Sequence, residues 1–120
     1  METIGTHRDL LAWKEAMALV ELIYAATVTF PRDEVFGLTA QLRRAAVSVP
    51  SNIAEGAARN SSREFVQFLG ITCGSIAEVE TQLELATRLG FLGGSTNVLR
   101  QANRVGCLVR LLRLSLKKTL

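Results

Sequence analysis

Apolar residues recur along this chain every three or four positions, which is the spacing of one face of an α-helix. The first such segment covers residues 10–27. It ends before Phe30-Pro31, because proline disfavours a helical conformation in the residue that precedes it. Thr6 and Asp9 have the spacing of a capping box at its start. The buried seam predicted for this helix consists of Leu10, Trp13, Met17, Val20, Tyr24 and Thr27.

The second helix is predicted after residues 31–34 and continues to about Ala58. Because Gly37 interrupts the pattern, the sequence does not fix the residue at which this helix begins. Asp33 and Thr39 are both candidate N-caps. Pro50 lies inside the apolar pattern and has no N–H to bond the carbonyl of Ala46, so we expect a kink there. The predicted apolar face consists of Leu38, Leu42, Ala45, Val49 and Ile53.

Two further helices follow a break at residues 59–62. Ser61 and Glu64 form a capping box at the start of the third helix, and Gly90 ends that helix. After a turn at Gly93-Gly94, Ser95 is the expected cap of the fourth helix. The seam of the third helix consists of Phe65, Leu69, Thr72, Ile76, Val79, Leu83 and Ala86. The fourth helix carries Val98, Ala102, Val105, Val109, Leu112 and Leu116 on one side, widened by Leu99, Leu108 and Leu111.

These four segments predict an all-α fold. No segment alternates apolar and polar residues over a useful length, so strands have no support in the sequence. Four helices joined by three short connections are typical of an up-down-up-down bundle. We therefore expect residues 1–120 to form a single four-helix-bundle domain.

The composition favours a cytosolic protein. The longest stretch without a charge spans residues 65–77, and a membrane span needs about 20 apolar residues, so none is expected. Glu2, Arg8 and Asp9 leave no apolar run for a signal peptide. Cys73 and Cys107 lie in apolar helical patterns outside any CxxC pair, so we expect reduced, buried thiols and no metal site.

Positive charge is concentrated at the end of the chain. The formal net charge is +3, but residues 94–120 alone carry six cations and no acid. The cations of this segment are Arg100, Arg104, Arg110, Arg113, Lys117 and Lys118. Such a segment favours polyanions such as nucleic acid, or an acidic protein face. A solvated helix face whose last turn suits cations is the alternative interpretation.

A stripe of polar residues follows one side of the second helix. It consists of Arg44, Ser48, Ser51, Asn52, Glu55 and Arg59, and it lies directly beside the apolar face. Polar groups at the edge of a core need partners, so we expect Arg44 and Glu55 to form ion pairs or hydrogen bonds and to be partly buried, with Ser75 and Glu78 as candidate partners. Two interpretations stay open: a structural network of Arg44, Ser48, Asn52, Glu55, Ser75 and Glu78 that sets helix register or a subunit contact, and a pocket or binding surface.

The sequence offers little catalytic chemistry. The single histidine, His7, lies near the N-terminus, and no HExxH, phosphate-binding loop or GxGxxG motif occurs. Gly74-Ser75-Ile76 lacks the second glycine of a nucleophile elbow. We therefore expect no enzymatic activity, no metal and no cofactor. An enzyme that uses an Arg44–Glu55 pair is a third, weaker hypothesis, which requires a closed pocket around the pair and a shifted pKa.

One run of residues resembles a known family. The run is residues 41–56, QLRRAAVSVPSNIAEG. The same family pattern includes Asp9-Leu10, Trp13-Lys14, Phe30-Pro31, Glu64-Phe65, Phe68-Leu69, Gly74-Ser75 and Glu78. Over residues 9–92 this pattern resembles the four-helix-bundle proteins first named from intervening sequences in bacterial large-subunit ribosomal RNA genes. The family's signature positions correspond here to Arg43, Arg44, Ser48, Asn52, Glu55, Gly56, Arg59, Glu64, Ser75 and Glu78. Ala57-Ala58 stands where relatives often have a glycine or an aromatic residue.

The resemblance implies a left-handed four-helix bundle that assembles as a homopentameric ring. A related branch, the accessory protein of diversity-generating retroelements, is basic and associates with a reverse transcriptase and nucleic acid. A gene's position inside an intervening sequence does not make its product a ribosomal protein.

Two functional hypotheses follow. The first is a cytosolic, non-enzymatic homopentamer that binds RNA or DNA through a basic surface, mostly by phosphate contacts. Its candidate binding residues are Arg43, Arg44, Arg59, Arg100, Arg104, Arg110, Arg113, Lys117 and Lys118. The second is a protein-interaction scaffold, in which the arginines pair with acids across subunits and the ring docks on a protein partner.

Overall fold

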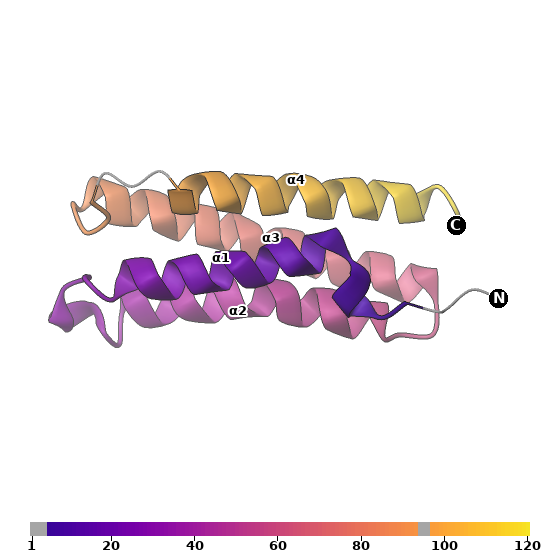
Figure 1. Cartoon of the computed structure of the whole chain (residues 1–120), viewed down its shortest axis with the longest axis horizontal. Coiled ribbons are helices and arrows are strands. Elements are labelled where there is room, and N and C mark those ends of the chain that lie inside the picture. Colours follow the sequence, from indigo (N-terminus) through magenta and orange to yellow (C-terminus); the bar gives the residue numbers. More distant parts are fainter. Residues whose placement is uncertain (1–4, 94–96) are drawn as a thin grey trace.

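The computed structural model describes residues 5–93 and 97–120, and its architecture is a bundle of four helices (Figure 1). The helices are α1 (Leu11–Thr27), α2 (Leu38–Ala57), α3 (Ser62–Arg88) and α4 (Asn97–Lys117). Two short 3₁₀ turns, η1 (His7–Asp9) and η2 (Arg32–Glu34), precede α1 and α2. The predicted all-α class and the number of helices are confirmed, and no strand occurs among the described residues.

Each of the four helices packs against two neighbouring helices. Helix α1 lies against α2 and α4, and α3 lies against the same two helices. Successive helices run in opposite directions, so the chain termini lie at one end of the bundle together with the α2–α3 turn (Figure 1). This arrangement agrees with the predicted up-down-up-down order. The left-handed sense of the bundle stays a prediction.

Local hydrogen bonds explain where the helices begin and end. Thr6 and Asp9 form the expected capping box, but it caps η1, and α1 begins only at Leu11. Ser61 accepts a hydrogen bond from the N–H of Glu64 at 3.2 Å, which confirms it as the cap of α3. Gly90, with φ of 79°, ends α3 in a Schellman motif, in which the Phe91 N–H bonds the Ala86 carbonyl at 2.8 Å. The Ser95 cap lies outside the described residues.

Helix α2 is capped differently from the prediction. Gly37 occupies the cap position and neither Asp33 nor Thr39 serves it. Instead, the carboxylate of Glu34 in η2 accepts a hydrogen bond from the N–H of Leu38 at 3.0 Å. A carboxylate next to the first turn also suits the positive end of the helix dipole.

The buried face of α1 differs from the predicted seam. The residues that α1 buries are Ala12, Ala16, Leu19, Ile23 and Thr27. Met17 and Tyr24, which the prediction placed in the core, are 43% and 42% exposed. The reason is that α1 is apolar on nearly every side, so two apolar stripes compete for the core. The stripe that contains two alanines faces inward, where small side chains let neighbouring helices approach closely.

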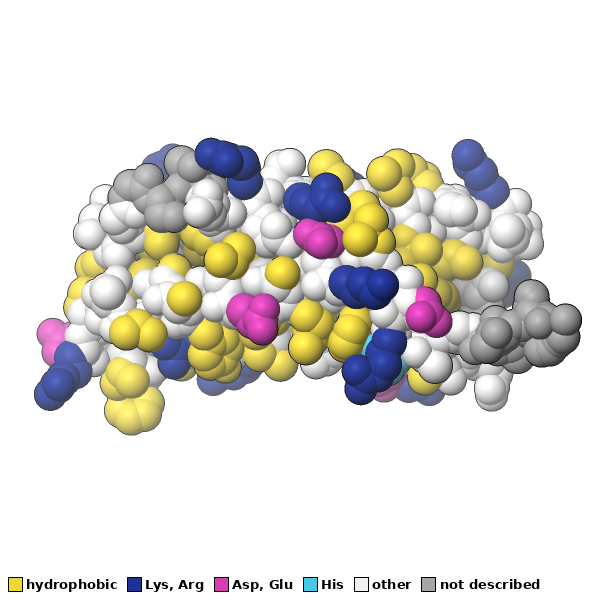
Figure 2. All heavy atoms as spheres, in the orientation of Figure 1, with side chains coloured by type: hydrophobic (Ala, Val, Ile, Leu, Met, Phe, Trp, Pro, Cys, Tyr) yellow, Lys and Arg dark blue, Asp and Glu magenta, His cyan; other side chains and the backbone are white. Residues whose placement is uncertain are grey.

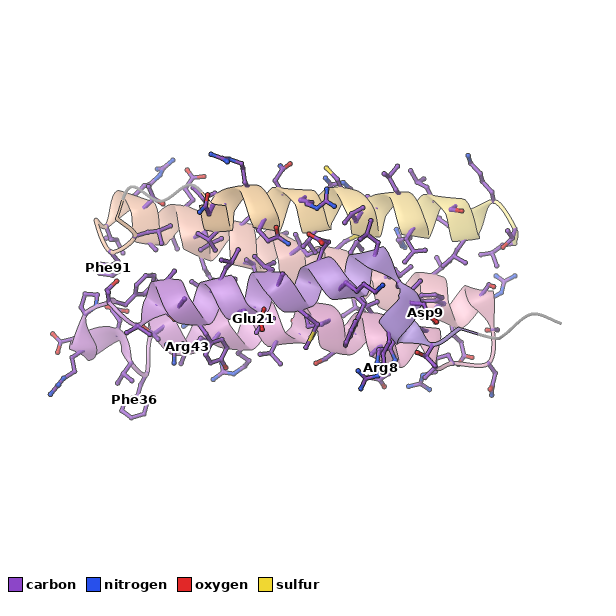
Figure 3. All side chains as sticks on the ribbon, in the orientation of Figure 1. Arg8, Asp9, Glu21, Phe36, Arg43 and Phe91 are labelled. Carbon is purple, nitrogen blue, oxygen red and sulfur yellow. The ribbon has the colours of Figure 1, made fainter. Side chains whose placement is uncertain are left out.

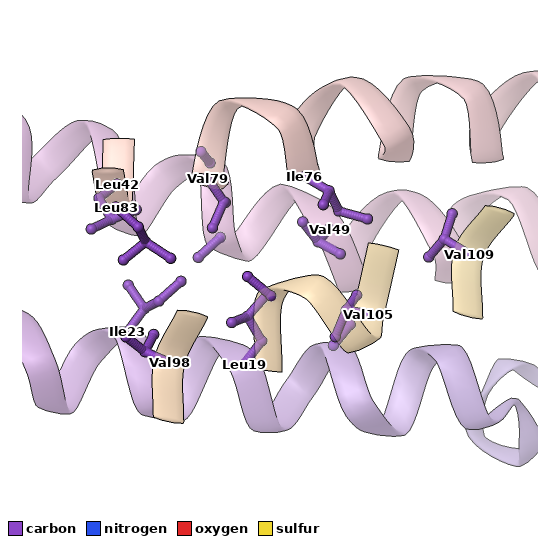
Figure 4. Close-up of a cluster of buried hydrophobic side chains, with 14 of the residues drawn as sticks. Leu19, Ile23, Leu42, Val49, Ile76, Val79, Leu83, Val98, Val105 and Val109 are labelled. Carbon is purple, nitrogen blue, oxygen red and sulfur yellow. The ribbon is translucent and has the colours of Figure 1, made fainter. Parts of the chain in front are cut away.

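The other three helices bury the faces that their patterns predict. Leu42, Val49 and Ile53 of α2 meet Ile76, Val79 and Leu83 of α3 in the core (Figure 4). Helix α4 completes this core with Val98, Val105 and Val109. Pro50 lies within α2 and is itself buried. Leu111 was predicted to widen the apolar side of α4. It is 62% exposed, so it does not belong to the buried face of this helix.

Gly56 marks a close contact between α2 and α3. A Cβ atom at this position would lie 2.6 Å from the Cβ of Phe68 and 2.9 Å from a ring carbon of Phe65. Only glycine leaves room for this approach, because any other residue would place a Cβ atom against α3. None of the described helices is long and apolar enough to cross a membrane.

Candidate nucleic-acid interface

Helix α4 carries most of the predicted cationic residues, and its middle is tied to α1. The amide of Gln101 donates to the carbonyl and to the carboxylate of Glu15, at 2.9 and 3.0 Å. The Nε of Arg104 donates to the same carboxylate at 2.9 Å. The hydrogen bonds from Gln101 and Arg104 lower the pKa of Glu15 below its ordinary value of about 4.5, so this carboxylate stays ionised and neutralises Arg104.

The C-terminal part of α4 lies beside the start of α3. Arg113 is half-buried, and its Nε donates to the carbonyl of Val66 at 3.1 Å. Its guanidinium also lies against Gly70, where a Cβ would come within 3.0 Å of Nη2. Lys117 and Lys118 follow one turn later and are exposed. This end of α4 therefore presents one half-buried arginine and two exposed lysines.

Arg110 lies on the same helix and keeps its guanidinium close to the helix surface. Its Nη2 contacts the Sγ of Cys107 at 3.5 Å. Cys107 is exposed and Cys73 is half-buried, so the expectation that both thiols are buried is wrong. Within the described residues, Arg110, Arg113, Lys117 and Lys118 have no carboxylate partner.

Three arginines in or just after α2 point to different places. Arg43 is half-buried against α1, where its Nε donates to the Thr27 hydroxyl at 2.8 Å and its guanidinium lies 4.6 Å from the Tyr24 ring (Figure 3). Arg59 pairs with Glu55 at 2.9 Å and covers the Phe68 ring at 4.8 Å. Arg44 is exposed and has no hydrogen bond or ion pair with a described residue.

The polar stripe along α2 does not form one connected network within the chain. Ser48 donates to the carbonyl of Ala45 at 2.7 Å, and Asn52 donates to the carbonyl of Ser48 at 2.8 Å, so both bonds stay inside the helix. Part of the stripe meets α3 around an open hollow of about 470 Å³, which is lined by Gln41, Arg44, Ala45, Ser48, Ser75 and Glu78.

The expectation that Arg44 and Glu55 are partly buried is wrong for both residues. Each side chain is exposed. Glu55 does form the expected ion pair, but its partner is Arg59, just after the end of α2, rather than Ser75 or Glu78. Arg44 and Glu55 also do not pair with each other, so the arrangement that the enzyme hypothesis required is not formed. Four of the six network residues, Arg44, Ser48, Ser75 and Glu78, nevertheless line the same hollow.

A known protein family matches most of the chain. The family model described as 23S rRNA-intervening sequence protein matches residues 8–110. The chain belongs to this family. No curated protein matches the chain.

The extent of the match refines the sequence-based resemblance. That resemblance covered residues 9–92, whereas the model of the 23S rRNA-intervening sequence proteins continues through most of α4. Arg100, Arg104 and Arg110 therefore lie inside the family match. Arg113, Lys117 and Lys118 lie beyond its last residue.

The nine candidate binding residues of this intervening-sequence protein do not gather on a single surface. Arg43 lies between α1 and α2, Arg44 lines the hollow between α2 and α3, and Arg100 and Arg104 line a groove between α1 and α4. Six of the nine lie along α4 or directly after it: Arg100, Arg104, Arg110, Arg113, Lys117 and Lys118. We name the exposed or half-buried cations at the end of α4, Arg110, Arg113, Lys117 and Lys118, the α4 basic end.

Sequence reasoning missed two side chains that accept hydrogen bonds from these arginines, the carboxylate of Glu15 and the hydroxyl of Thr27. Gln101 and Arg104 share the Glu15 carboxylate, and the Thr27 hydroxyl accepts from Arg43. Gln101 and Arg104 are three positions apart on α4, a spacing that puts two donors on one helix face and could have indicated the site. Thr27 carried no such signal, because it occupies a position of the apolar seam.

Proposed function

We propose that this protein is a cytosolic, non-enzymatic homopentamer that binds nucleic acid through a basic surface. The observation that carries the proposal is that residues 94–120, which include α4, hold six of the chain's cations and no acid. A helix that only balanced its own dipole would need cations in its last turn alone. Here the cations extend over five turns, from Arg100 to Lys118, which suits a polyanion better than a helix cap.

The contacts of the α4 basic end support phosphate binding. Lys117 and Lys118 are exposed, and Arg113 is held in place by the Val66 carbonyl, so the surface is partly pre-ordered. No exposed aromatic side chain accompanies these cations in the described part of α4. Base stacking is therefore not expected, and binding should depend on phosphates and be largely independent of sequence.

Assembly strengthens such binding. A ring of five subunits repeats the α4 basic end five times, so a long nucleic acid can contact several copies at once and gain affinity by multivalency. Apolar side chains that remain exposed on the subunit, among them Met17, Tyr24 and Leu111, are consistent with further contacts between subunits. Native mass spectrometry should give a species of five times 13.1 kDa.

Binding should depend steeply on salt. With six to ten phosphate contacts, affinity for duplex DNA or structured RNA falls by about 10³–10⁵ between 50 and 200 mM salt. The variant Lys117→Ala/Lys118→Ala should reduce the salt slope by about one for each phosphate contact that is lost. Fluorescence anisotropy of labelled RNA and DNA at several salt concentrations measures both quantities.

Lys14→Ala is the matched control, because Lys14 is an exposed lysine of α1 that is not among the candidate binding residues. This variant should keep the slope of the unchanged protein. If an intact pentamer fails to bind RNA and DNA even at low salt, nucleic acid is not the partner, and the protein-interaction scaffold is the remaining hypothesis.

A further inference from the structure

A hollow between α2 and α3 has no part in the α4 basic end. Its volume is about 470 Å³, which lies within the roughly 300–1,000 Å³ of sites that hold small molecules. Its lining residues are Gln41, Arg44, Ala45, Ser48, Ser75 and Glu78, and we name it the α2–α3 hollow. All of them except Ala45 have polar or charged side chains, so this surface favours a ligand that is held by polar contacts.

The antiparallel packing of α2 and α3 brings these side chains together. The two helices are in close contact where Gly56 meets Phe68. Ser48 lies about two turns before Gly56 on α2, and Ser75 lies about two turns after Phe68 on α3. Because the two helices run in opposite directions (Figure 1), both serines lie at the same level of the bundle. One turn farther from Gly56, each helix adds a charged side chain to the hollow.

The two charged side chains of the hollow, Arg44 and Glu78, have opposite signs and no partner within the described part of the chain. Both are exposed, and they form no ion pair or hydrogen bond with each other. The face shown in Figure 2 differs, because acidic and basic side chains lie among one another there and Glu15 pairs with Arg104 at 2.9 Å. The α2–α3 hollow therefore offers one cation and one anion that its own residues do not neutralise.

Two buried polar side chains of α3 also lack a hydrogen-bond partner. Ser75 is 9% exposed and lines the hollow, and its hydroxyl makes no hydrogen bond with a described residue. Gln82 follows seven residues later, on the same face of the helix; it is 8% exposed, and its Oε1 is buried without a partner. Buried polar groups are nearly always hydrogen-bonded, so these two groups favour a polar ligand on this side of α3.

The charges of the hollow select the chemistry of that ligand. The guanidinium of Arg44 suits a carboxylate or a phosphate. A phosphate is disfavoured, because the carboxylate of Glu78 faces the same hollow and like charges repel. Glu78 is an acceptor only, so it suits a group with several N–H donors, such as an ammonium. A molecule that carries both an ammonium and a carboxylate satisfies both side chains.

We propose that the α2–α3 hollow binds a small zwitterion of the amino-acid class. The carboxylate of the ligand lies on Arg44, where the free hydroxyl of Ser75 can donate to it as well, and the ammonium lies on Glu78. Ala45 is the single apolar side chain among the lining residues, so short polar molecules fit better than apolar ones. This site is separate from the α4 basic end and depends neither on nucleic-acid binding nor on assembly.

A titration of the full chain followed by ¹H–¹⁵N NMR tests the site. The probes are glycine, β-alanine and γ-aminobutyrate, in which the distance between the two charges increases. At least one of them should give saturable shifts that concentrate in residues 41–48 and 75–82. Acetate and ethylamine, which carry one charge each, and inorganic phosphate should bind about 10-fold more weakly or less, because each lacks one of the two charge-assisted contacts.

Two variants, each removing one charge, assign the roles. Arg44→Met and Glu78→Gln should each weaken binding of the best zwitterion by about 10-fold or more. In Arg44→Met, ethylamine should bind as well as the zwitterion, because the carboxylate of the ligand has lost its partner. Both side chains are exposed, so the variants should fold, which far-UV circular dichroism verifies. Arg63→Met and Glu21→Gln are the matched controls, because they remove exposed charges outside the hollow, and they should leave the affinity unchanged.

Other outcomes overturn the inference in distinguishable ways. No saturable shift with any of the three zwitterions would show that the hollow is not a site for this class of ligand. Phosphate that binds as tightly as the best zwitterion would make it a simple anion site. An equal loss in the control variants would mean that the overall charge of the chain is responsible. Variants that change self-association but bind no zwitterion would make the hollow a protein contact.

Discussion

Replacing Gly56 with alanine is expected to destabilise the protein by about 1–3 kcal/mol, although alanine is the better helix former. The added methyl group would lie 2.6 Å from the Cβ of Phe68, a distance that real Cβ atoms do not tolerate. Phe68 cannot relieve the contact by rotating its ring, because its Cβ is fixed to the backbone of α3. Helices α2 and α3 must therefore move apart. Thermal unfolding at a fixed protein concentration should show a melting temperature lower by several degrees.

Gly74→Ala is the matched control, because Gly74 lies within α3 but a Cβ there has no atom within 4 Å. This substitution should stabilise the protein by about 0.5–1 kcal/mol through helix propensity alone. The two substitutions are chemically identical, so their opposite signs isolate the close approach at Gly56. Equal stabilisation by both would mean that α2 and α3 are farther apart than the structure places them.

The sequence could predict the fold to this depth because most of the helices are amphipathic with a single apolar face. In α3, polar residues surround the seam of Leu69, Ile76 and Leu83, so only one orientation buries it. The helix ends were predictable where their signals are local, as at Ser61 and Gly90. The cap of α2 was not, because the carboxylate of Glu34 reaches it from a separate 3₁₀ turn.

The candidate site was less predictable, because the fate of an arginine depends on which helix lies next to it. Spacing alone placed Arg44 and Arg59 on one stripe, yet Arg59 pairs with Glu55 while Arg44 has no partner among the described residues. Arg43 was assigned to the basic surface and instead bonds Thr27 across the α1–α2 contact. The concentration of cations in and just after α4 could be predicted, because it is a property of the sequence and does not depend on side-chain geometry.

Leu19→Ala is expected to destabilise the protein by about 3–5 kcal/mol, whereas Met17→Ala should cost less than about 1 kcal/mol. Leu19 is fully buried between the helices, so its truncation leaves a cavity in the core. Met17 is 43% exposed, so its truncation removes little buried surface. Chemical denaturation of both variants at one protein concentration measures the two costs.

This pair decides which of the two apolar stripes of α1 forms the core. The heptad spacing of the sequence favoured the stripe of Met17 and Tyr24, and the structure instead buries that of Leu19 and Ile23. If Met17→Ala were the more damaging change at every protein concentration, α1 would be rotated from its place in the structure. A cost of Met17→Ala that appears only at concentrations where subunits associate would have a different cause, since it would place the exposed stripe in a contact between copies.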